Sequence, residues 1–118
     1  MAVSGAQNNL ISRMMDAAVM RHEVLSNNLA NQNTPGFTRK TVDFESLLRT
    51  AVKSGKSDTR GIAPQVKEDR VTPKKEDGNN VNLELELTGI RENQLLFDTY
   101  AGIMKANFDI LQTSVRTR

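Results

Sequence analysis

The last third of the sequence repeats apolar residues at alternating steps of four and three, and this pattern constrains the fold more than any other feature. Such spacing places the side chains in one seam of an α-helix that can lie along a second helix. The chain is therefore predicted to end in a long helix within residues 81–118. Its seam positions are Leu83, Leu87, Ile90, Gln94, Phe97, Ala101, Met104, Phe108, Leu111 and Val115.

The start of this helix has an alternative. Residues 83–87 alternate apolar and charged side chains, which is typical of a strand, and Gly89 could separate that strand from the helix. We favour a continuous helix, because Leu83 and Leu87 keep the register of the seam and Asn80 or Asn82 can cap it. Gly89 and Gly102 each cost about 1 kcal/mol relative to alanine inside a helix, so they indicate a close neighbour, a bend or simple tolerance.

The N-terminal residues 1–34 carry the same alternation and are predicted to form a second axial helix. A capping box at Ser4 and Gln7 can begin it. It must end before Pro35, which lacks a backbone donor, and Gly36 supplies the positive φ of a type II turn. The seam of this helix consists of Ile11, Met15, Ala18, His22, Leu25 and Leu29.

Residues 35–80 connect the two helices and are predicted to be largely irregular. One short amphipathic helix is predicted at 43–53, whereas residues 53–80 are rich in charge, proline and glycine and should form an extended or partly disordered loop. The expected fold is thus mainly α. The two terminal helices pair as an antiparallel coiled coil around one assembly core, with an irregular polar loop between them.

Each long helix carries a second apolar stripe that one partner helix cannot cover. An uncovered apolar band marks an interaction surface, so we expect this face to contact other subunits, copies of the same chain among them. A short helix at 43–53 is too short to span either long helix. The predicted intersubunit face consists of Leu10, Met14, Val24, Leu96, Tyr100, Ile103 and Ile110.

The sequence offers no basis for catalysis, a cofactor or a metal site. His22 is the sole histidine and lies in the apolar seam, and there is no cysteine. We find no phosphate-binding loop, nucleophile elbow or acid–base pair of carboxylates. The net charge of +2 and the lack of aromatic residues among the central lysines and arginines argue against a nucleic-acid partner. No stretch reads as a cleaved signal or a membrane span.

The segment around the predicted helix end resembles the signature of the axial proteins of the bacterial flagellum, the rod and hook family. Asparagines there can end a helix and satisfy its last carbonyls, and the Pro-Gly turn leaves an aromatic ring able to pack back. Residues 78–83, 92–95 and 106–108 are further similar to the short proximal rod members, although Leu85 and Leu87 depart from the expected charged run. The signature residues are Asn27, Asn28, Leu29, Ala30, Asn31, Thr34, Pro35, Gly36 and Phe37.

This resemblance implies a structural subunit that polymerises through its terminal helices into a hollow drive shaft, which transmits torque and lines an export channel. It implies export by the flagellar type III apparatus without a cleaved signal, to the rod in the periplasmic space. The implied partners are other rod proteins, a rod-base adaptor, the export gate and the membrane ring, with no membrane insertion. The alternatives are another small rod protein, a free-standing helical adaptor or a weak nucleic-acid binder.

Overall fold

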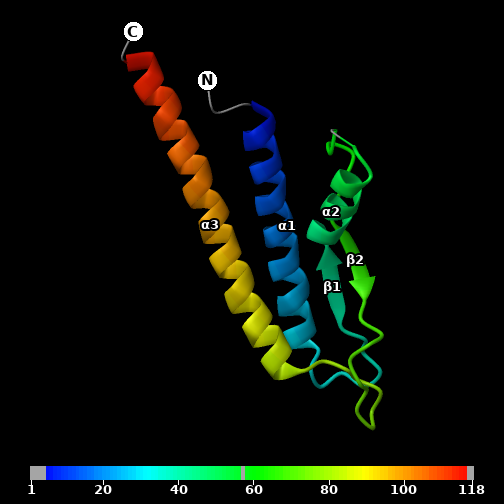
Figure 1. Cartoon of the computed structure of the whole chain (residues 1–118). Helices are drawn as coiled ribbons and strands as arrows, with labels where there is room; N and C mark the ends of the chain where they lie inside the picture. Colours follow the sequence, from blue (N-terminus) through cyan, green and yellow to red (C-terminus); the bar gives the residue numbers. More distant parts are fainter. Residues whose placement is uncertain (1–4, 57, 117–118) are drawn as a thin grey trace.

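The computed structural model describes residues 5–56 and 58–116 of the chain. Along the sequence they form α1 (Gly5–Ala30), β1 (Lys40–Asp43), α2 (Glu45–Lys53), β2 (Gln65–Glu68) and α3 (Leu83–Arg116). The predicted mainly helical fold is confirmed, because the two long helices contact each other and run antiparallel (Figure 1).

The helix α1 lies between α3 and the middle region that carries β1, β2 and α2 (Figure 1). The described chain measures 67 × 30 × 15 Å, so it is long and thin. Its apolar core is correspondingly small, since helices one layer deep enclose little volume. The buried apolar residues are Ala17, Ala18, Leu25, Val42, Phe44, Ala51 and Val81.

The predicted helical start of α3 is confirmed, and Asn82 caps it. Its Oδ1 accepts hydrogen bonds from the backbone N–H groups of Glu84 at 3.0 Å and Leu85 at 3.3 Å. These donors are among the four that a helix N-terminus leaves without partners. The strand alternative for residues 83–87 is therefore excluded. The predicted capping box at Ser4 lies outside the described residues.

The turn after α1 forms as predicted. The N–H of Phe37 donates to the carbonyl of Thr34 at 3.2 Å, and Gly36 has a φ of 75°. A positive φ at the third position is what a type II turn requires. The turn is also held from outside, because the N–H of Gly36 donates to the carbonyl of Asp77 at 2.8 Å.

The middle region is more ordered than predicted. Strands β1 and β2 pair antiparallel, with Lys40 opposite Glu68 and Asp43 opposite Gln65. All four residues of β2 are exposed, and three of them are polar or charged. The segment therefore has no alternation of apolar and polar residues that would predict a strand. The pairing comes from the partner strand, because backbone hydrogen bonds need no apolar face. The short helix is present, and α2 begins two residues later than the 43–53 prediction.

Candidate assembly site

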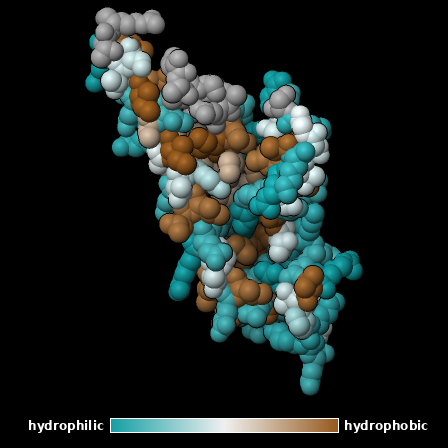
Figure 2. Space-filling view, in the orientation of Figure 1, coloured by the Kyte–Doolittle hydropathy of each residue, from teal (hydrophilic) through white to brown (hydrophobic). Residues whose placement is uncertain are grey.

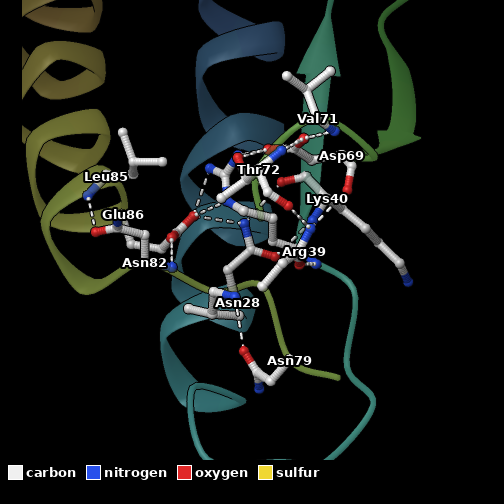
Figure 3. Close-up of polar contacts among 12 residues, drawn as sticks. Asn28, Arg39, Lys40, Asp69, Val71, Thr72, Asn79, Asn82, Leu85 and Glu86 are labelled. Atoms are coloured by element: carbon white, nitrogen blue, oxygen red, sulfur yellow. Dashed lines mark hydrogen bonds and ion pairs between the residues drawn. The ribbon is translucent and has the colours of Figure 1, made fainter. Parts of the chain in front are cut away.

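A buried ionic cluster joins α3 to the middle region at the end of the molecule where α1 stops (Figure 3). Glu86 of α3 is 0% exposed, and its Oε1 accepts from Nη2 of Arg39 at 2.7 Å and from Nε at 3.0 Å. Nη1 of Arg39 forms an ion pair with Asp69, which follows β2. A buried guanidinium thus holds two carboxylates from segments that are distant in sequence, a geometry that suits the planar donor fork of arginine.

Asn28 of α1 connects the first long helix to this cluster. Its Nδ2 donates to Oε1 of Glu86 at 2.9 Å and to the carbonyl of Lys40 at 2.8 Å, and its Oδ1 accepts from the N–H of Lys40 at 2.9 Å. The side chain therefore pairs with β1 as a neighbouring strand would. Asn28 is fully buried, and its amide makes both donor contacts and accepts one hydrogen bond.

Two further buried asparagines tie the loop ends to the same place. Nδ2 of Asn79 donates to the carbonyls of Asn31 and Thr34, both at 2.8 Å, so it covers the end of α1 and the turn. Oδ1 of Asn80 accepts from the N–H of Arg39 at 2.6 Å, and its Nδ2 donates to the carbonyl of Asp69 at 2.7 Å. The end of the molecule where α1 stops is consequently held together by the hydrogen bonds of amide side chains rather than by apolar packing.

The environment stabilises the charged forms in this cluster. Burial by itself would raise the pKa of Asp69, but hydrogen bonds from the hydroxyl and N–H of Thr72, from the N–H of Val71 and from Arg39 hold it well below its usual range. Burial would likewise lower the pKa of Arg39, yet the hydrogen bonds and charges of Glu86 and Asp69 raise it above its ordinary value. Asp69 and Arg39 are thus both charged at neutral pH.

A second buried polar contact lies halfway along the helix pair. Nδ2 of Asn93 donates to the carbonyl of Ala18 at 2.6 Å, and Oδ1 accepts from Nη1 of Arg21 at 3.3 Å. Nη2 of Arg21 forms an ion pair with Glu45 at 2.6 Å. Asn93 therefore fixes the position of α3 along α1, and Arg21 connects the pair to the start of α2.

The signature residues have divided roles. Asn31 ends the helix as predicted, because its Nδ2 donates to the carbonyl of Asn27 at 2.8 Å. Asn28 has a different role, since it joins the helix to β1 and α3. Its partners Arg39, Asp69 and Glu86 were not predicted from the sequence, because single charges in a charged stretch read as solvated. Leu29 and Phe37 are half-buried, whereas Ala30, Thr34, Pro35 and Gly36 are exposed.

The residues of the predicted intrachain seam differ in how deeply they are buried. Ala18 and Leu25 are buried. The half-buried members are Ile11, Met15, Leu29, Ile90, Phe97, Ala101, Met104 and Leu111, and the exposed members are His22, Leu83, Leu87, Phe108 and Val115.

The contact line of α3 differs from the predicted one by a partial rotation of the helix. The most buried positions of α3 are Glu86 and Asn93, each one residue before Leu87 and Gln94 of the predicted seam. Their hydrogen bonds to Asn28 and to the carbonyl of Ala18 favour this orientation, because either side chain would lose its partners if it pointed to another neighbour. Apolar spacing alone cannot reveal a polar contact line.

As a result, α1 contacts α3 along a line between two apolar stripes of α3. Both stripes remain partly exposed to solvent. At 100° per residue, Leu96 and Ile103 fall on one side of Asn93, and Leu87 and Phe108 fall on the other. All four are exposed in the single chain. Hydrophobic side chains accordingly gather over the helix pair, while the loop end of the molecule is mostly hydrophilic (Figure 2).

Three residues of the predicted intersubunit face line one groove. The groove has a volume of about 480 Å³ and runs between α3, α1 and β1, and Val24, Leu96 and Tyr100 contribute to its walls. Burial raises the pKa of Tyr100, and the negative charge of Glu45 adds to this effect. Of the other predicted face residues, Leu10 and Met14 are half-buried, and Ile103 and Ile110 are exposed.

Within residues 5–56 and 58–116, no cluster of histidine and acidic side chains could hold a metal ion. None of the helices in these residues is long and apolar enough to cross a membrane. The apolar stripes and the groove with its charged walls are surfaces that can contact another molecule.

Comparison with known proteins points to one family. Residues 2–38 match the family described as Flagella basal body rod protein. The chain is 27% identical to Flagellar basal body rod protein FlgB of Borrelia hermsii, across 85% of this chain and 88% of the relative. It is 28% identical to the protein of that name in Bacillus subtilis (strain 168), across 93% and 92%. For the Escherichia coli (strain K12) protein of that name, the identity is 26% across 84% and 88%.

Proposed function

This chain belongs to the flagellar basal body rod protein family, and from that premise we propose that it is a subunit of the proximal rod that polymerises through α1 and α3 into a hollow shaft. Like the family, it is a structural protein and not an enzyme, and it assembles with other rod proteins. Relatives of nearly the same length match most of the chain, which supports the assignment to a short member.

The observation that carries the proposal is the pair of apolar stripes that flank the α1–α3 contact. A helix pair that is apolar on both sides of its own contact needs neighbours on both sides. Leu96 and Ile103 represent one stripe, and Leu87 and Phe108 represent the other. Two different faces on one subunit favour an open helical array over a closed dimer.

The finer parts of the proposal follow from the family resemblance. The helix pair lines the inner wall of the shaft, and the shaft transmits torque and conducts exported proteins. Neighbours at the base are the adaptor, the export gate and the membrane ring. The subunit reaches the rod through the flagellar type III apparatus without a cleaved signal.

The test is a matched pair of substitutions on α3 in cells that lack their own copy of the gene. Ile103 is 43% exposed in a stripe, whereas Leu95 is 68% exposed and points away from both stripes. We expect Ile103→Asp to be expressed normally but to be absent from isolated basal bodies and to abolish swimming, because a charge cannot be buried in an apolar interface. Leu95→Asp should swim.

Normal swimming of the Ile103→Asp strain contradicts the assignment of this face. Loss of swimming in both strains contradicts it as well, because the defect would then come from any charge on α3. Immunoblots of whole cells and of purified basal bodies separate failed expression from failed assembly.

A further inference from the structure

The sequence of α3 allows two ways of pairing with α1, and they share half of their contact residues. The shared column, with members seven residues apart and half-buried, consists of Ile90, Phe97, Met104 and Leu111. In the structure the second column, which we call the polar column, consists of Glu86, Asn93, Tyr100 and Asn107. The pairing predicted from apolar spacing uses instead an apolar column, which consists of Leu87, Gln94, Ala101 and Phe108.

The polar column is the more buried of the two. Glu86 is 0% exposed and Asn93 is 4% exposed, whereas Leu87 is 40% exposed and Phe108 is 58% exposed. Burial of apolar surface alone would favour the opposite orientation, with the apolar column turned toward α1. A polar interaction must therefore decide which column of α3 lies against α1.

Asn93 provides this interaction for most of the length of α3. Its Nδ2 donates to the carbonyl of Ala18 at 2.6 Å, and its Oδ1 accepts from Nη1 of Arg21 at 3.3 Å. Glu86 anchors only the first turn of α3, and beyond Asn93 no polar side chain of α3 is buried within the described residues. The orientation of residues 94–116 thus depends on one amide.

The contact of Asn93 can be lost without leaving its partners unsatisfied. The carbonyl of Ala18 lies inside α1, where a carbonyl also accepts from the backbone N–H four residues later. Arg21 has two other acceptors, since its Nη2 donates to Oε2 of Glu45 at 2.6 Å and to the carbonyl of Val42 at 3.4 Å. The hydrogen bond to Ala18 therefore selects an orientation and is not required by α1 itself.

We propose that Asn93 is a positioning residue for assembly, which holds α3 in the polar pairing and so keeps the apolar column exposed for contacts between subunits. A single buried asparagine can select one pairing of helices over another at a cost in stability. The proposal rests on the proposed function, because it names the residue that keeps the stripe of Leu87 and Phe108 available. If α3 turned its apolar column toward α1, that stripe would be buried within one chain.

The test moves the amide by one residue along α3. In the double variant Asn93→Ala with Gln94→Asn, the polar column loses its anchor and the apolar column gains one. An asparagine at position 94 reaches α1 only if α3 turns its apolar column toward α1, because neighbouring helical residues point about 100° apart. Gln94→Asn alone is the matched control, since Asn93 is then still present.

Intrachain disulfides report the orientation, because the chain contains no cysteine of its own. One heptad outward from the contact of Asn93 with Ala18, Ile11 of α1 lies opposite Tyr100 of the polar column. Ala101, the next residue, belongs to the apolar column. Ile11→Cys is therefore combined with either Tyr100→Cys or Ala101→Cys. The full chain is oxidised at a concentration at which it is helical, and the cross-linked monomer is measured on non-reducing gels.

In the parent chain, we expect the pair at 11 and 100 to close at least about five times faster than the pair at 11 and 101, whose Cβ vectors point apart. The order should reverse in the double variant and should stay as in the parent in Gln94→Asn. Asn93→Ala alone should reduce the preference, because neither column then has an anchor. A loss of structure without reorientation would instead slow both pairs.

The parent order in the double variant overturns the role of Asn93. A parent chain that closes the pair at 11 and 101 faster overturns it as well, and this measurement holds even if the double variant does not fold. In cells, the double variant should be expressed but absent from basal bodies. Reversed cross-linking with normal swimming also overturns the proposal. The motility of the Ile103→Asp strain tests the proposed function separately, so the two failures are distinguishable.

Discussion

Asn28 of α1 and Glu86 of α3 are 58 residues apart in sequence, yet Nδ2 of Asn28 donates to Oε1 of Glu86 at 2.9 Å and both side chains are completely buried. The same amide exchanges two hydrogen bonds with the backbone of Lys40. One side chain thus holds together both long helices and the strand β1. Its loss should separate the middle region from the helix pair.

We expect Asn28→Ala to lower the free energy of unfolding by about 2–4 kcal/mol. The substitution removes the side-chain partners of the N–H and carbonyl of Lys40 and one of the three hydrogen bonds to Oε1 of Glu86, and each buried group left unsatisfied costs about 1–3 kcal/mol. Urea unfolding followed by circular dichroism measures the change, with all variants at one protein concentration at which the parent chain is helical. Asn27→Ala is the matched control, because Asn27 is exposed on the same turn and should change stability by less than about 0.5 kcal/mol. Equal effects of the two substitutions contradict the role of Asn28.

Asp69 should make the protein sensitive to acid. Its pKa is lowered in the folded chain, so its contribution to stability is fully present above the unfolded value of about 4 and is lost as the pH falls through the lower folded value. We expect Asp69→Asn to be less stable than the parent at pH 7 by about 1.5–3 kcal/mol, because charged hydrogen bonds to Arg39 and Thr72 are lost.

The difference between these two proteins should stay constant from pH 7 to about pH 5 and shrink below about pH 4. Both proteins contain all the other acidic groups. The difference between their free energies of unfolding, measured as a function of pH, therefore reports the contribution of Asp69. A difference that stays constant down to pH 2 contradicts the low pKa, and one that already shrinks at pH 6 assigns the effect to another group.

The two glycines of α3 should respond differently to alanine. A Cβ at Gly89 would lie 3.2 Å from Cδ1 and 3.3 Å from Cδ2 of Leu25, whereas a Cβ at Gly102 would meet no atom within 4 Å. Gly102→Ala should therefore gain about 0.5–1 kcal/mol of stability from helix propensity. Gly89→Ala should not raise stability, because the side chain of Leu25 must shift to make room for the Cβ and this offsets the gain in helix propensity. Thermal unfolding of both variants tests this, and equal stabilisation contradicts the close contact.

The isolated chain should be poorly ordered at low concentration and should gain helix on association. The two exposed stripes leave the single copy with few buried apolar side chains, so ordering α3 costs more than one copy recovers. Hydrogen exchange of α3 amides at increasing protein concentration measures this. Full protection of a dilute monomer contradicts the prediction.

The long helices and their ends could be predicted from the sequence, because their signals are local. The four-three alternation, Pro35 and the asparagine cap each act on residues within a few positions. The type II turn at Gly36 and the helical start at Leu83 were predicted for that reason. Gly89 was predicted to mark a close neighbour, a bend or simple tolerance, and the structure shows the first of these.

The buried ionic cluster and the two strands could not be predicted in this way. Arg39, Asp69 and Glu86 come from three segments, and each alone looks like a solvated charge. The strand β2 has no apolar face, so its order depends on pairing with β1. The orientation of α3 depends on Asn93 and Glu86, whose hydrogen-bond partners lie more than 50 residues away. Contacts of this kind leave no periodic trace in one sequence.

The thinness of the subunit has a consequence for the growing rod. A molecule 15 Å in its shortest dimension has almost no interior of its own, so in the proposed rod its exposed apolar side chains would be covered by neighbouring subunits. The free energy of folding and the free energy of assembly are then largely the same quantity, and subunit stability depends on concentration and position. The tip of a growing rod would act as the template on which each arriving chain becomes ordered, and its terminal layer would be the first to melt.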